Sequence, residues 1–85
     1  MQTLVRELRG IPCFLLEEYL QELGGVLTGE NIVRGEGWIV TLEHMEPYRL
    51  GSLEVGQTRL TMELDDPIAK DFLEHFGMKI LRAGA

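Results

Sequence analysis

The feature that most constrains the fold of this 85-residue chain is a strict alternation of residue types from position 57 to position 64. The even positions hold Thr58, Leu60, Met62 and Leu64, and the odd positions hold Gln57, Arg59, Thr61 and Glu63. Successive side chains of a β-strand point to opposite faces of its sheet. The stretch therefore predicts a strand with one face on an apolar core and the other in water.

Two segments show the different period of an amphipathic helix. Pro12 and Pro67 suit the first turn of a helix, where the missing N–H is not needed, and Gly24 and Gly77 suit the left-handed position after the last turn. We therefore expect helices between Pro12 and Gly24 and between Asp65 and Gly77. Their apolar stripes are Leu15, Leu16, Tyr19, Leu20 and Leu23 in the first, and Ile68, Ala69, Phe72, Leu73 and Phe76 in the second.

Turn residues divide the rest of the chain into strands. Pro47 should interrupt a ladder, because it donates no hydrogen bond. A bulge at Gly51-Ser52 is expected, since it would bring both Leu50 and Leu53 onto the core despite their odd spacing. Residues 79–85 should add a short strand or fray. The expected strands are residues 3–8, 26–34, 38–45, 48–55 and 57–64.

The predicted fold class is α+β: one domain, residues 1–85, with the order β-α-β(4)-α. Both helices should lie on the apolar face of a curved antiparallel sheet. Trp38 is expected in the core beneath the second helix, near Phe72 or Phe76. On the opposite face, three apolar side chains are expected to form an association surface. These interface candidates are Val33, Ile39 and Met45.

Composition excludes several classes of protein. Eight Lys and Arg against fourteen Asp and Glu give a net charge of −6, which disfavours nucleic acid as a partner. The apolar runs are far shorter than the ~20 residues of a membrane-spanning helix. No signal peptide is expected, because charged residues interrupt the first ten positions. One cysteine forms no internal disulfide, as expected in the cytoplasm. The abundance of Leu, Glu, Gly and Arg is compatible with a thermophile.

No spacing of residues predicts an enzyme, a bound cofactor or a metal site. Glu43-His44-x-Glu46 combines an imidazole with two carboxylates, but a strand would place Glu43 and His44 on opposite faces. Cys13 lies where a helix N-terminus would activate a thiol, although burial as a small apolar group is the favoured interpretation. His75 suits the last turn of a helix. The Arg and Glu residues that alternate along the strands are expected to form cross-strand ion pairs.

The sequence leaves two candidate functions, both of them binding functions. The first is a binding module that recognises a protein partner or forms a homodimer through the outer sheet face or a sheet edge. The second is a binder of a small ligand or anion in a cleft between the helices and the sheet. The ligand-binding candidates are Tyr48, Arg49 and Arg59.

Two motifs resemble a known family: Leu15-Leu16-Glu17-x-Tyr19-Leu20-x-Glu22-x-Gly24-Gly25 and Glu46-Pro47-x-x-x-Gly51-Ser52-Leu53-x-x-x-Gln57-x-Arg59-x-x-x-Glu63. Both are similar to the uncharacterised C-terminal domain of the MoaD-related protein of Thermus, here as a stand-alone chain. The resemblance implies a TATA-binding-protein-like fold and a link, through domain neighbourhood, to molybdenum cofactor or sulfur-carrier metabolism. Sulfur carriers related to MoaD end in Gly-Gly, whereas this sequence ends in Arg82-Ala83-Gly84-Ala85. The chain is therefore not expected to be the carrier itself.

Overall fold

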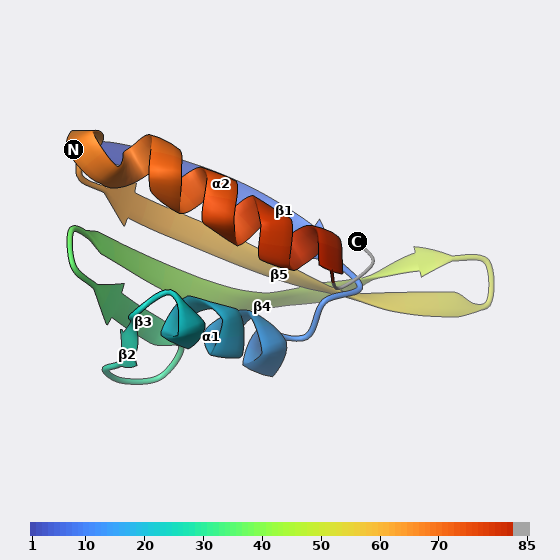
Figure 1. Ribbon diagram of the computed structural model, residues 1–85. Coiled ribbons are helices and arrows are strands. Elements are labelled where there is room, and N and C mark those ends of the chain that lie inside the picture. Colours follow the sequence, from blue (N-terminus) through green and yellow to red (C-terminus); the bar gives the residue numbers. More distant parts are fainter. Residues whose placement is uncertain (83–85) are drawn as a thin grey trace.

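A computed structural model, which describes residues 1–82, consists of one five-stranded antiparallel sheet and two helices (Figure 1). The strands lie in the order β1-β5-β4-β3-β2, and both helices cover the same face. The α+β class and the β-α-β(4)-α order are confirmed, whereas the narrower TATA-binding-protein-like assignment stays a prediction. The elements are β1 (Gln2–Arg9), α1 (Cys13–Glu22), β2 (Val26–Leu27), β3 (Ile32–Gly35), β4 (Trp38–Leu50), β5 (Leu53–Leu64) and α2 (Asp66–Arg82).

The core lies between the sheet and the helices, as the alternation in β5 predicts. The side chains of Leu16 and Leu20 from α1 are fully buried, and they pack in one cluster with the inward residues of β4 and β5. Trp38 is 6% exposed, and its ring centroid lies 4.8 Å from that of Phe72. The expected position of Trp38 beneath the second helix is confirmed.

Helix α1 ends in a Schellman motif. Gly24 adopts φ +97°, and its N–H donates to the carbonyl of Gln21, while the N–H of Gly25 donates to the carbonyl of Leu20. The predicted role of Gly24 is confirmed. The following Gly25 is needed for a different reason, because a Cβ there would lie 2.5 Å from Cη2 of Trp38.

Helix α2 does not end at Gly77 as predicted, but continues to Arg82. The extra turns bury Ile80 against the core and bring Lys79 Nζ to 3.0 Å from Glu22 Oε1 of α1. Burying an isoleucine contributes about 1.5–3 kcal/mol, more than the ~1 kcal/mol that a glycine inside a helix costs. Tertiary contacts therefore outweigh the local stop signal. The remaining part of the expected terminal strand, residues 83–85, lies outside the described residues.

Residues 38–64 form one long hairpin of two strands. Three strands were expected there, 38–45, 48–55 and 57–64, with a bend at Pro47 between the first two. Strand β4 runs through Pro47, and a two-residue turn at Gly51-Ser52 joins the paired residues Leu50 and Leu53. The bulge lies between Met45 and Tyr48, so its expected place at Gly51-Ser52 is wrong.

The extra residue at the bulge moves every later side chain of β4 to the opposite face. Leu50 and Leu53 are 62% and 64% exposed. Their expected contact with the core is therefore wrong, because both side chains lie on the face of the hairpin turned away from the helices. The hairpin tip also extends past both helices (Figure 1).

The expected strand 26–34 is divided into β2 and β3 by a turn in which Asn31 adopts φ +60°. Strand β3 pairs with β4 so that Val33 lies opposite Val40. Directly opposed residues share a face of the sheet, and both valines are fully buried. The placement of Val33 on the outer face is therefore wrong, and its neighbour Ile32 lies there in its place.

Candidate interaction surface

The outer face is the side of the sheet that faces away from the helices. Ile39 and Met45 lie on it, as expected, because they alternate with the buried Trp38, Val40 and Leu42. Both are half-buried. Their part in an interface stays a prediction.

Charged residues of the outer face form cross-strand ion pairs, as expected. Arg59 Nη2 lies 3.1 Å from Glu7 Oε2 of β1, and Arg59 Nη1 lies 3.4 Å from Glu43 Oε2 of β4. The three residues are directly opposed in the register of the sheet. This row fixes the guanidinium of Arg59 between two carboxylates.

The part of the β4–β5 hairpin from residue 46 to residue 56 is called the arm here. Strand β1 ends where Arg9 pairs with Gln57, and the N–H of Gly10 then donates to the carbonyl of Gly56. Beyond this point the two strands of the arm pair only with each other, and they extend away from the helices (Figure 1). A lone two-stranded ribbon is marginally stable in water, so the arm draws stability from its continuity with β4 and β5.

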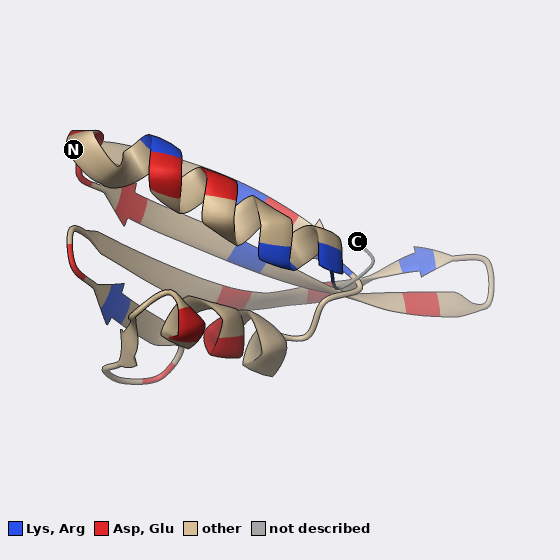
Figure 2. Cartoon of the chain, viewed as in Figure 1, with Lys and Arg blue, Asp and Glu red and all other residues tan. Residues whose placement is uncertain are grey.

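The arm has one apolar and one charged face. Tyr48 pairs with Val55 and Leu50 with Leu53, and these two pairs share a face because Arg49 and Glu54 alternate with them. The opposite face carries an ion pair with Arg49 Nε 3.1 Å from Glu54 Oε1. Figure 2 shows these as a blue and a red band toward the tip of the arm.

The apolar face of the arm continues the outer face of the sheet. Leu53 and Val55 have the same odd spacing along β5 as Gln57 and Arg59, which point outward. A contact between Arg9 of the outer face and Tyr48 of the arm agrees with this continuity. The guanidinium of Arg9 lies 3.8 Å from the ring centroid of Tyr48. The outer face and the arm therefore form one surface along the whole hairpin.

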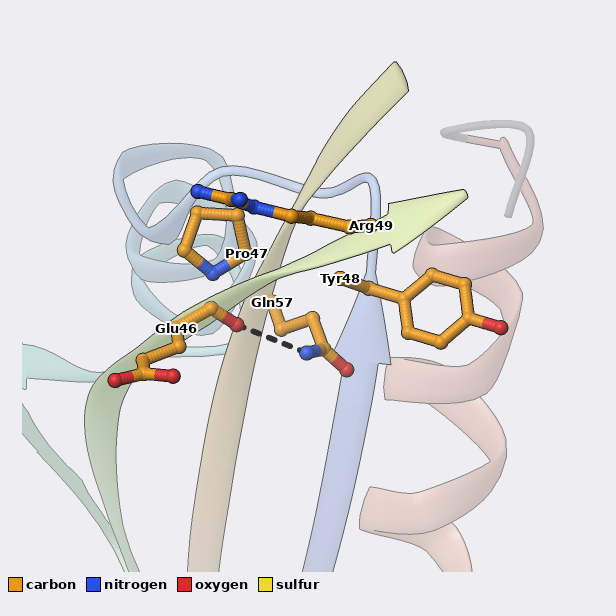
Figure 3. A pocket seen from close by; sticks show the side chains of 5 residues that line it. All are labelled: Glu46, Pro47, Tyr48, Arg49 and Gln57. Carbon is orange, nitrogen blue, oxygen red and sulfur yellow. Dashed lines mark hydrogen bonds between the residues drawn. The ribbon is translucent and has the colours of Figure 1, made fainter. Parts of the chain in front are cut away.

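An open hollow of about 650 Å³ lies at the bulge (Figure 3). Gln57 Nε2 donates to the carbonyl of Glu46 at 2.9 Å, and Gln57 Oε1 accepts from Arg9 Nε at 3.1 Å. These bonds hold the bulged segment against β5. The side chains of Tyr48 and Arg49 point to opposite sides of the strand.

The three ligand-binding candidates do not meet in a cleft between helices and sheet. Arg59 lies on the outer face, since its neighbour Leu60 fills the core. Tyr48 and Arg49 lie on the arm, beyond the helices. The expected site is therefore wrong, because none of the three lines the open hollow of about 190 Å³ between the helices and the sheet, whose walls include Leu23, Trp38 and Phe72.

The other chemical candidates occupy separate places. Cys13 is buried, as expected, with its Sγ 3.4 Å from Thr58 Oγ1. His75 Nδ1 donates to the carbonyl of Asp71 at 2.7 Å, and His44 is exposed. Within residues 1–82, no three His, Cys, Asp or Glu side chains gather in a group that could hold a metal ion.

Ile32 and the arm were not predicted. The expected strands 26–34 and 38–45 imply a turn between them, and counting outward from a two-residue turn at Glu36-Gly37 places Val33 opposite Val40. Gly51-Ser52 between Leu50 and Leu53 is itself a two-residue hairpin signal. The first turn predicts the outward position of Ile32, and Gly51-Ser52 predicts the hairpin whose end is the arm.

The described part of the chain thus defines a small α+β protein whose exposed features are an apolar arm and a sheet face crossed by ion pairs. Neither of its helices has the length and apolarity to cross a bilayer. The chain belongs to the archaeal MoaD-like protein family, whose model matches residues 4–85. No curated protein matches it. A MoaD-related chain is confirmed, while the narrower resemblance to a C-terminal domain of the Thermus protein stays a prediction.

Proposed function

We propose that this protein is a non-catalytic interaction module that binds proteins of sulfur-carrier or molybdenum cofactor metabolism in the cytoplasm. The observation that carries the proposal is the arm, which holds Leu50 and Leu53 in water, each more than 60% exposed. Exposed apolar patches with a polar border are typical of binding sites. The family supplies the link to MoaD-related metabolism.

The proposed binding surface is the outer face together with the apolar face of the arm. We propose that the same surface supports a homodimer with Ile39 and Met45 as contacts. Ile32 replaces Val33 as the third contact, because Val33 is buried in the core. A mixed-charge border allows self-complementary pairing about a two-fold axis.

The test is calorimetric titration of the protein with purified sulfur-carrier and large subunits of molybdopterin synthase from the same source. We expect a dissociation constant in the range of about 1–100 μM for at least one subunit, and its loss in the double variant Leu50→Ser/Leu53→Ser. Phe14→Ser is the matched control, because Phe14 is 67% exposed on α1, outside the proposed surface. Absence of binding by the wild type to both subunits contradicts the proposal.

An alternative is a binder of small anions at the bulge. The hollow there is lined by Tyr48, Arg49 and Gln57, and Arg9 borders it through its contact with Tyr48. Thermal-shift measurements with phosphate, nucleotides and pterins test this function. A stabilisation that Arg49→Gln removes would support it, and unchanged melting with every compound would exclude it.

A further inference from the structure

We infer that a second copy of this chain covers the proposed binding surface, that is, the outer face together with the apolar face of the arm. The arm of each copy lies over the end of the other copy's outer face that holds Ile32 and Ile39. This reciprocal arrangement rests on the proposed function and specifies its self-association. The occupant follows from three properties of the surface: its pattern, its charge and its size.

The hairpin has apolar side chains at both ends of its outer face and a row of ion pairs in the middle. One end holds Ile39, which lies between Arg34 and Glu63, and one strand away Ile32. The other end holds the apolar face of the arm. Between them lies the row in which Arg59 pairs with Glu7 and Glu43. A two-fold axis through the middle places each apolar end on the unlike apolar end of the partner copy.

The charge favours approach by this face. The outward positions of the strands hold three acidic residues and three basic residues, so the face is neutral although the chain carries −6. The excess acid lies elsewhere: α1 holds three glutamates and no basic residue, and Figure 2 shows it with red bands only. Two copies therefore repel least when their outer faces meet. The outward charged residues are Glu7, Glu43 and Glu63 with Arg9, Arg34 and Arg59.

The size is sufficient for a specific dimer. From Glu63, opposite Ile39, to Leu53 the surface spans ten residues of β5, or about 33 Å at 3.3 Å per residue. Three strands are about 14 Å wide, so two such faces bury on the order of 1,000 Å² in total, near the lower limit of specific interfaces. A dissociation constant of ~1–100 μM is expected.

Pairing of arms edge to edge is disfavoured. Pro47 supplies no N–H to an added strand, and the bulge between Met45 and Tyr48 bends the exposed edge of β4. On the other strand of the arm, only the short segment from Leu53 to Val55 lacks a neighbour, because the carbonyl of Gly56 accepts from Gly10. Packing of the two faces is therefore favoured over pairing of the arms.

The test is cross-linking with a short bismaleimide at ~100 μM protein, in a Cys13→Ser background whose fold is verified by circular dichroism. Three samples are compared: Ile39→Cys alone, Leu53→Cys alone and an equal mixture of both. The reciprocal dimer predicts a cross-linked product that is at least fivefold more abundant in the mixture. Phe14→Cys mixed with Leu53→Cys is the control and should give none.

The outcomes separate this inference from the broader proposal. A product from Ile39→Cys alone, with none added by mixing, overturns the reciprocal arrangement but leaves a face-to-face dimer. A wild type that sediments as a monomer at ~100 μM overturns self-association, whereas binding to pathway proteins is decided by the titration above.

Discussion

The indole ring of Trp38 lies directly on the backbone of Gly35, its partner across the β3–β4 turn. A Cβ at Gly35 would overlap ring atoms of the indole, including Cε2, Cζ2 and Nε1. The absence of a side chain at this position is thus a packing requirement of the tryptophan. Gly35 has no positive φ that would demand glycine on conformational grounds.

Gly35→Ala should therefore destabilise the protein by about 1–3 kcal/mol, because the indole must move in a packed core. Urea unfolding followed by tryptophan fluorescence measures the change. Gly56→Ala is the matched control, since a Cβ there meets nothing within 4 Å and φ is not positive. Equal stability of the two variants would contradict the packing argument.

Trp38→Ala should cost ~3–5 kcal/mol, a large part of the ~5–15 kcal/mol typical of a domain. The tryptophan contacts Phe72 and also covers Gly25 and Gly35. Native wild-type emission should be blue-shifted because the ring is buried. An emission maximum equal to that of the urea-unfolded chain would show that the indole is in water.

Leu50→Ser/Leu53→Ser should change the free energy of unfolding of the monomer by less than ~0.5 kcal/mol, as expected for exposed positions. Leu60→Ala, a truncation of a fully buried leucine, should cost about 2–5 kcal/mol. Thermal denaturation at low protein concentration compares them. A large loss from the arm variant would place these side chains in a core after all.

Cys13 should react with a thiol reagent only when the chain unfolds. Cys13 is 6% exposed, and its thiol contacts Thr58 inside the protein. The labelling rate should follow the unfolded fraction as urea is increased. Rapid labelling in native buffer would show that the start of α1 opens independently of the rest.

Ile39→Glu should leave the fold intact and dissociate the proposed homodimer. The residue is half-buried on the outer face beside Glu63, so a second carboxylate there repels the facing copy. Sedimentation velocity at ~100 μM together with far-UV circular dichroism checks both parts. A variant that still sediments as a dimer would exclude the outer face as the interface.

The sequence by itself determined the local structure and the inward residues of the long elements. The alternation around Leu60 and the stripe of α1 require a sheet with helices on one face, because period 2 and period 3.6 each define a single buried side. Trp38 was placed correctly for the same reason, and Gly24 because glycine suits the left-handed position after a helix. These features depend on residues that are close in the chain.

Only the tertiary structure decided where the local sequence patterns no longer predict the fold. Helix α2 passes Gly77 because Ile80 finds the core, and Val33 turns inward because β4 places Val40 opposite it. The bulge before Tyr48 turns Leu50 to the outer face, where it lies opposite Leu53 of β5, so both leucines lie in water. Burial depends on what lies across from a residue, and that neighbour comes from a distant part of the chain.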